Sequence, residues 1–183
     1  MSLSILVCAF GVACSQAPNR TAEDLNRIEE YIENGDKLRL DRRFDEAKIS
    51  YEKALEVAKA KEFIGWVVAA KRGIATVYCN KKEYERCETL MTENFELCLS
   101  RPDCSSDILE IPLNDLNYHY VFEIRDKEKP RKFVTLFRST KAKFGKEEYR
   151  SVACDYAKIF VEAGHRELAL QLSEEVKCQQ DPG

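Results

Sequence analysis

The stretch Arg42-Arg43-Phe44-Asp45-Glu46-Ala47-Lys48-Ile49-Ser50-Tyr51-Glu52-Lys53-Ala54-Leu55 decides the fold of this chain. Within it, the large Phe44 and Tyr51 and the small Ala47 and Ala54 fall on one stripe of an α-helix, because residues three or four apart share a helix face. The two alanines let a second helix approach closely, and the aromatic rings fill the space around them. The stretch therefore predicts one helix of a closely packed helical hairpin.

The same spacing continues upstream and recurs downstream. Before the quoted stretch, Tyr31, Gly35 and Leu38 place a large, a small and a large residue on the preceding helix. The later units repeat this order of large and small residues, with Ile74, Ala75, Tyr78, Tyr84, Cys87 and Met91 in the second unit, and Ala153, Tyr156, Ala157, Phe160, the turn residue Gly164 and Ala169 in the last.

This recurrent pattern resembles the tetratricopeptide repeat, a helix-turn-helix unit of about 34 residues. The resemblance implies an all-α fold, a right-handed α-solenoid of antiparallel helix pairs with about eight helices. It also implies a concave face that binds a peptide or a protein. The offset from Phe44 to Tyr84 is 40 residues, which predicts helices longer than those of the family.

Turn and cap residues predict where the helices begin and end. Thr21 or Asp24 can cap a first helix that runs to about residue 41, and its partner covers about 44–61. A break follows at 100–106, then a linker at 108–113 and a helix at about 114–127. Pro130 can start the next helix, which ends before residue 145.

The N-terminus predicts export. Residues 3–13 are apolar and small, too few to span a bilayer but suited to a signal peptide. Gly11-Val12-Ala13-Cys14 resembles a bacterial lipoprotein signal, which implies lipidation of Cys14. We therefore expect a signal peptide at 1–13, a tether at 14–20, a helical domain at 21–183 and a membrane-anchored protein of the bacterial periplasm. Ordinary cleavage after Ala13 with secretion, or an apolar N-terminal helix packed on the domain, are the alternatives.

Cysteine usage agrees with an oxidising compartment. Of the eight cysteines, Cys8 would leave with the signal peptide and Cys14 would carry lipid, so an even number of six remains. Cys87 and Cys98 are eleven residues apart on one expected helix, roughly 16 Å, and cannot pair. Geometry favours Cys98–Cys104 across the break and Cys154–Cys178 at adjacent ends of the last hairpin, and Cys79–Cys87 remains by elimination, with buried free thiols as the alternative.

No catalytic, cofactor-binding or metal-binding motif occurs in the sequence. It lacks a Gly-rich phosphate loop, His-Glu-x-x-His and Gly-x-Ser-x-Gly, and no Cys-x-x-Cys pair or Cys/His cluster indicates zinc. His119 has aromatic neighbours, and a structural role explains it better than a catalytic one. The helical phase instead predicts partner-binding side chains on the first helices of the pairs, namely Asp36, Arg39, Arg72, Thr76 and Lys158.

One further segment differs from the rest of the chain in its positive net charge. The chain carries a net charge of −3, yet residues 125–150 hold ten Lys or Arg and four Asp or Glu. This segment could face anionic lipids or an acidic partner, although a solvated helix face also explains it. We expect no enzyme, no cofactor and no nucleic acid partner, but an adaptor that binds a protein or peptide and reaches the membrane through its N-terminal lipid. The alternatives are an enzyme or ligand-binding protein with a pocket near Tyr118–Tyr120, and a eukaryotic secreted helical protein.

Overall fold

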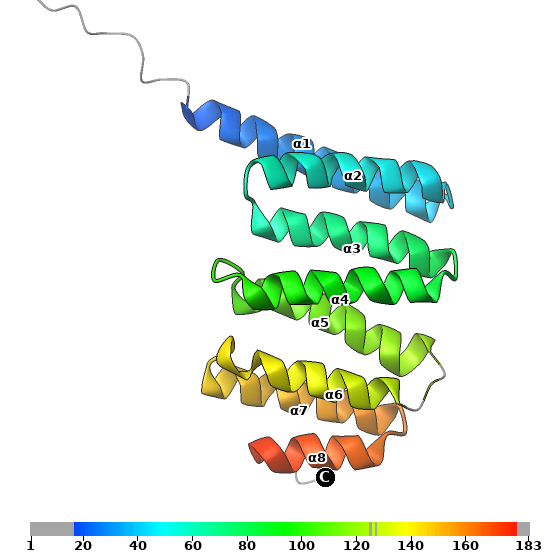
Figure 1. Ribbon diagram of the computed structural model, residues 1–183, viewed down its shortest axis with the longest axis vertical. Helices are drawn as coiled ribbons and strands as arrows, with labels where there is room; N and C mark the ends of the chain where they lie inside the picture. The colour runs from blue at the N-terminus through cyan, green and yellow to red at the C-terminus, as the bar shows by residue number, and fades with distance from the viewer. Residues whose placement is uncertain (1–16, 125, 127, 179–183) are drawn as a thin grey trace, which may run out of the picture.

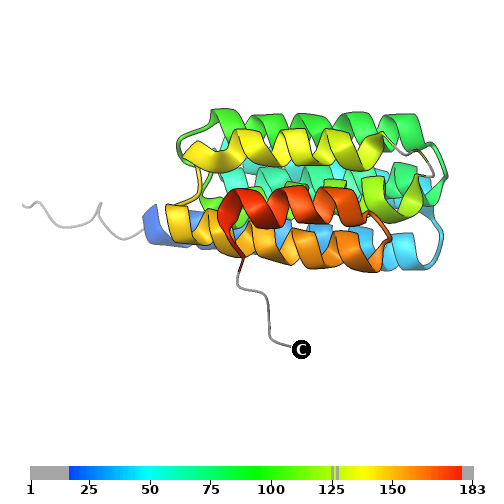
Figure 2. The same cartoon turned by 90° about the horizontal axis from the view of Figure 1, so that it is seen from below.

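The structure is a computed structural model that describes residues 17–178 apart from 125 and 127. The helices run back and forth and stack one beside the next (Figure 1), with their axes nearly parallel when seen along the stack (Figure 2). The prediction of an all-α solenoid with eight α-helices is confirmed, and the described residues contain no strand. The elements are α1 (Ala17–Leu40), α2 (Phe44–Ala60), α3 (Ile64–Asn80), α4 (Tyr84–Ser100), α5 (Ser106–Tyr118), a π-helix (His119–Glu123), α6 (Lys129–Ser139), a 3₁₀-helix (Thr140–Ala142), α7 (Lys146–Glu162) and α8 (Arg166–Val176).

Four of the connections between consecutive helices are three-residue turns with the same backbone conformation. The middle residue of each turn has a left-handed backbone, and the residue after it donates its N–H to the carbonyl five residues back, the Schellman arrangement. The predicted turn residue Gly164 fits this position because glycine has no Cβ to strain. The other three turns place Arg42, Glu62 and Lys82 there, with φ near 60°, which glycine spacing in the sequence does not reveal.

Two glycines and one tyrosine hold the first three helices together. A Cβ on Gly35 of α1 would lie 2.6 Å from Cε1 of Tyr51, and one on Gly73 of α3 would lie 2.5 Å from the same atom. The ring of Tyr51 from α2 therefore occupies the space that only glycine leaves open on both neighbours. Its hydroxyl donates to Asp36 at 2.7 Å, and the ring is almost wholly buried.

The helices also form two layers. Among the odd-numbered helices, α3 contacts both α1 and α5, and Tyr156 of α7 donates to Asn114 of α5 at 2.8 Å. On the other side, α6 contacts α8, and side chains of α4 reach α6. The odd-numbered layer carries all five residues that the sequence analysis assigns to partner binding.

Larger side chains pack the C-terminal half. Phe133 and Phe137 of α6 contact Tyr149 and Tyr156 of α7, with ring centroids 4.7 to 5.2 Å apart in the closest pairs. Aromatic rings keep these two helices further apart than the alanine and glycine contacts keep α1, α2 and α3.

The predicted boundaries of the helix that follows the break at 100–106 are wrong. Residues 108–113, expected as a linker, belong to α5, and the helix expected at 114–127 ends at Tyr118 and continues as the π-helix. Leu109, Leu113 and Leu116 form a fully buried stripe in the core shared with α4. Burying three leucines outweighs the one helical hydrogen bond that Pro112 removes.

A pair of alanine substitutions tests the glycine contact. Gly73→Ala should destabilise the fold by about 1–3 kcal/mol, because the new Cβ would overlap the Tyr51 ring. Gly65→Ala, in the same helix, meets only Cδ1 of Ile108 at 3.6 Å, so the usual helix preference for alanine should make it neutral or stabilising. Urea unfolding of both variants measures the difference, and equal effects would contradict this packing.

Candidate functional site

Four of the predicted partner residues gather on α1 and α3. Asp36 accepts hydrogen bonds from the Tyr51 hydroxyl and, at 3.3 Å, from Arg39. Arg39 also donates to the Tyr51 oxygen at 3.4 Å, and burial together with the Asp36 bond raises the pKa of Tyr51 to about 12. Since Gly35 and Gly73 flank the same ring, Asp36 and Arg72 occupy neighbouring positions on adjacent helices.

Arg72 meets a partner that the sequence analysis missed. Its Nε donates to Asp115 of α5 at 3.0 Å, and Thr76 donates to the Arg72 carbonyl at 2.9 Å. The Arg72 side chain is 55% exposed, whereas that of Asp115 is 13% exposed. Burial raises the pKa of Asp115, and the guanidinium of Arg72 opposes that shift. Four charged residues and one threonine of α1, α3 and α5, namely Asp36, Arg39, Arg72, Asp115 and Thr76, are called the odd-helix surface below.

Lys158 and Cys14 do not join this surface. Lys158 lies on α7, where it pairs with Asp155 at 3.4 Å and lines a groove of about 1080 Å³ against α8. Leu170 and Cys178 line the same groove. Cys14, the predicted lipidation site, lies outside the described residues, as do residues 15 and 16 of the predicted tether. The rest of the predicted tether, residues 17–20, is helical, because α1 begins at Ala17 and not at the predicted caps Thr21 or Asp24.

The structure brings the six remaining cysteines together in the three expected pairs. The Cα–Cα distances are 5.2 Å for Cys79–Cys87, 5.3 Å for Cys98–Cys104 and 5.7 Å for Cys154–Cys178, all within the range of disulfides. Cys79–Cys87 spans the turn between α3 and α4, and Cys154–Cys178 ties the end of the described chain to α7.

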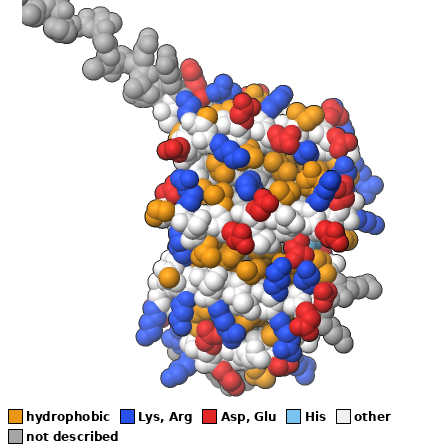
Figure 3. Space-filling view, viewed as in Figure 1, with side chains coloured by type: hydrophobic (Ala, Val, Ile, Leu, Met, Phe, Trp, Pro, Cys, Tyr) orange, Lys and Arg blue, Asp and Glu red, His pale blue; other side chains and the backbone are white. Residues whose placement is uncertain are grey.

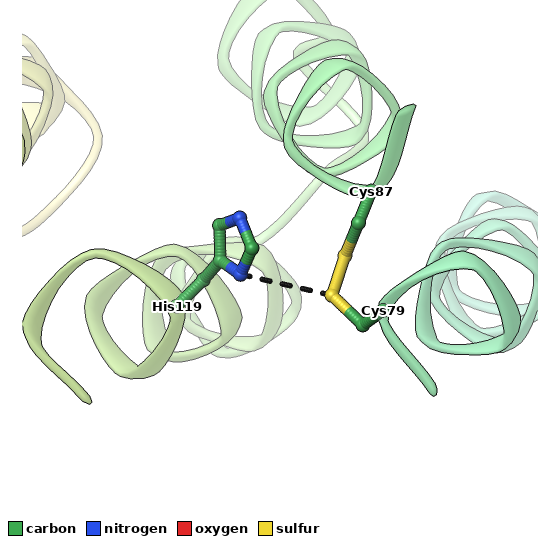
Figure 4. Close-up of side chains that lie close together, drawn as sticks. All are labelled: Cys79, Cys87 and His119. Atoms are coloured by element: carbon green, nitrogen blue, oxygen red, sulfur yellow. Dashed lines mark hydrogen bonds between the residues drawn. A yellow bond between two sulfur atoms is a disulfide. The ribbon is translucent and has the colours of Figure 1, made fainter. Parts of the chain in front are cut away.

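One of these disulfides lies beside a buried histidine (Figure 4). Nδ1 of His119 is 3.6 Å from the sulfur of Cys79 and 2.6 Å from a carboxylate oxygen of Glu123. The sequence shows no Cys/His cluster, but in three dimensions Cys79, Cys87 and His119 lie together, with one potential ligand atom of each within 4.8 Å of the others. Chain spacing conceals it, since 40 residues separate Cys79 from His119.

The three residues Tyr118, His119 and Tyr120 do not share one environment. Tyr118 is exposed to solvent, whereas His119 and Tyr120 are fully buried. In addition, both the sulfur and the carboxylate approach the same nitrogen of His119, Nδ1. A histidine that relays a proton between a carboxylate and a nucleophile uses its two different nitrogens. The arrangement thus lacks the geometry of nucleophilic catalysis.

Acidic residues of other helices pair with much of the basic segment 125–150. On the face seen in Figure 3, cationic and anionic side chains are interspersed. Lys143 donates to the Arg101 carbonyl. Arg125 and Lys127 lie outside the described residues. The ion pairs are Lys129–Glu88 at 2.7 Å, Lys132–Glu88 at 2.9 Å, Arg131–Glu167 at 3.1 Å and Arg138–Glu175 at 2.8 Å.

Glu88 on α4 is the centre of this charge network. It accepts hydrogen bonds from Lys129, from Lys132 and from the Tyr120 hydroxyl at 2.8 Å. Burial alone would raise its pKa, but the three donors outweigh burial and lower the pKa of Glu88 to about 2. The network joins α4 to α6 and therefore links the N-terminal helices of the solenoid to its C-terminal helices.

No protein-family model, curated protein or solved structure matches this chain. Within residues 17–178, none of the described helices combines the length and the apolar character that crossing a bilayer requires.

The Glu88 network predicts acid sensitivity. Because the folded pKa of Glu88 lies below the ordinary 4.5, its stabilisation is complete above about pH 4.5 and is lost as the pH falls towards 2. Glu88→Gln should lower the free energy of unfolding at neutral pH by about 1–2 kcal/mol, allowing for solvent screening, and should flatten the acid dependence. Urea titrations across this pH range measure both effects. Glu85→Gln, an exposed site one turn earlier on α4, is the control and should leave the profile unchanged.

Proposed function

We propose that this protein is a tetratricopeptide-like adaptor that binds a protein or peptide through the odd-helix surface. The observation that carries the proposal is the row of charged side chains, partly exposed and already oriented by hydrogen bonds, on adjacent helices of a solenoid. Solenoids present such rows to extended partners. Orientation before binding reduces the entropy that these side chains lose when a partner arrives.

The chemistry of Arg72 suggests what the partner offers. Only Nε is engaged by Asp115, and the side chain is more than half exposed, so its terminal nitrogens can donate to a carboxylate. Arg39 lies beside Asp36 on α1, the helix that contacts α3, and its side chain is 24% exposed. An acidic side chain or a C-terminal carboxylate of an extended peptide fits this pair of guanidinium groups.

The proposed location is the periplasmic face of a bacterial membrane. The lipoprotein-like sequence ending in Cys14 supports anchoring, and three disulfide pairs support an oxidising compartment. By analogy of architecture, the protein would work like the pilotin and outer-membrane assembly accessory lipoproteins, which escort or scaffold membrane complexes.

Site-specific photo-crosslinking tests the binding surface. A photoreactive residue at Thr76 should give one defined adduct with envelope extracts of the source cells, and Arg72→Gln should reduce that adduct at least several-fold by removing the donors. The control position is Ile49, which is exposed on α2 and lies in the other layer. An equal adduct from Ile49, or an adduct unaffected by Arg72→Gln in a variant with unchanged thermal unfolding, would refute the proposed surface.

Replacing Cys14 tests the anchor separately. Cys14→Ser should release the protein into the soluble fraction or stall its processing, since diacylation holds a protein on membranes far more firmly than one chain does. Fractionation and intact-mass measurement give the result. A wild-type mass without lipid, with fractionation that Cys14→Ser does not change, would exclude lipidation while leaving the binding surface to its own test.

A further inference from the structure

The two ends of the solenoid carry faces that none of the described helices covers. In Figure 1, α1 forms the upper end of the stack and α8 the lower end. At the lower end α7 and α8 leave open a groove, called the terminal groove below, whose lining includes Arg150, Lys158, Val161, Leu170 and Lys177. Val161 is 53% exposed and Leu170 is 60% exposed. Since a terminal solenoid unit needs a polar outer face to remain soluble alone, these aliphatic side chains indicate a surface that another helix covers.

Positive charge gathers at the other end of the terminal groove. Arg150 lies near the start of α7 and donates at 2.8 Å to the carbonyl of Lys177, which follows α8. The acidic neighbour of Arg150, Glu147, is 3.9 Å away with an 80% exposed side chain, and such a pair contributes little. Three lysines or arginines line the groove against two glutamates, Glu147 and Glu174. The groove therefore fits a helix that is apolar at one end and acidic towards the other.

The outer face of α1 has this chemistry. Glu29, Glu30, Glu33 and Leu40 are all exposed and fall on one face of the helix, opposite the fully buried Ile28. Leu40 is 74% exposed, the largest value among the exposed large apolar side chains of residues 17–178. The ion pairs that α1 forms within the described chain involve other residues, so the three glutamates are available to cations of another molecule.

We propose that α1 of a second copy docks in the terminal groove, so that copies stack end to end and continue the solenoid. Because consecutive helices are antiparallel, the odd-numbered helices all run in one direction (Figure 1). An α1 added after α8 would therefore run parallel to α7. The contact joins two different surfaces, so each copy uses its α1 towards one neighbour and its groove towards the next.

The spacing of the matching residues agrees on the two helices. Glu30 lies ten residues before Leu40, and Arg150 lies eleven residues before Val161. At a rise of 1.5 Å per residue, these separations are roughly 15 Å and 17 Å. With Leu40 placed against Val161, Glu30 therefore reaches Arg150 in the same register. Burial of the aliphatic side chains and attraction between the opposite charges then favour the same arrangement.

The same register would bring Lys158 to the odd-helix surface. Lys158 lies three residues before Val161, and Asp36 lies four residues before Leu40, so the two would lie level. Both are on odd-numbered helices, and their side chains are exposed within one chain. The row of charged side chains would thus continue from one copy to the next. Stacking itself does not depend on what that surface binds, so it is tested apart from the proposed function.

The expected association is weak and sensitive to salt. One helix in a groove places this contact among the small specific interfaces, at about 1,200 Å² or less in total. Part of the attraction is between exposed charges, which added salt screens. Sedimentation velocity of the full chain carrying Cys14→Ser, which excludes association through lipid, should therefore show oligomers that grow with micromolar concentration and recede at high salt.

Two single variants and their mixture identify the surfaces. In the Cys14→Ser background, Arg150→Glu disables the groove and Leu40→Asp disables α1, so each alone should associate about ten-fold more weakly or less and sediment as a monomer. When they are mixed, the intact α1 of the first and the intact groove of the second should form a one-to-one complex that grows no further. Arg166→Glu makes the same charge change on an exposed residue of α8 outside the groove, and this control should associate like the unchanged protein.

The one-to-one complex would also show that both variants are folded. The proposal is overturned if the Cys14→Ser protein stays monomeric throughout the micromolar range, or if Arg150→Glu associates as before. It is also overturned if the mixture remains monomeric while both variants keep the thermal unfolding of the unchanged protein. Association that begins only after residues 179–183 are removed would assign the groove to the C-terminal residues of the same chain, and would likewise overturn the proposal.

Discussion

The ring of Tyr51, enclosed between Gly35 and Gly73, is the constraint on which the N-terminal half depends. A ring of fixed shape sets the spacing of three helices at once, and only residues without a Cβ leave room for it on both sides. The same side chain extends to the surface, where its hydroxyl contacts Asp36 and Arg39. Packing in the core and the orientation of the odd-helix surface are thus coupled through one residue.

The C-terminal half solves the same packing problem with larger side chains. Between α6 and α7, stacked and edge-on aromatic rings fill the space that small residues close in the first half. Because wider helix spacing reduces backbone contact, individual side-chain links between helices contribute more to holding this half together. Glu88 connects α4 to α6, and the three disulfides hold a turn, a break and the last hairpin. The Glu88 network and each disulfide lie where close helix packing is weakest or where the chain reverses.

Charge distribution narrows the kinds of partner that the surface can recognise. The basic segment would attract anions over a distance if its charges were unpaired, but Glu88, Glu167 and Glu175 offset much of it locally. Long-range attraction therefore contributes little, and the proposed recognition of a partner would depend on short-range geometry at Arg39 and Arg72.

The sequence by itself determined the helical class, the number of helices, the position of α2 and the turn at Gly164, because local spacing of large and small residues decides which helix face is buried. It also determined the cysteine pairs, since residues close along the chain or at adjacent hairpin ends have few alternatives. Only the tertiary structure decided that residues 108–113 are helical, that Arg72 meets Asp115, and that His119 reaches Cys79. These contacts join residues about 40 apart, and their free energy arises only after packing brings separate helices together. The charge of the basic segment could be counted from the sequence, but its neutralisation depends on glutamates of α4 and α8 that no local pattern connects to it.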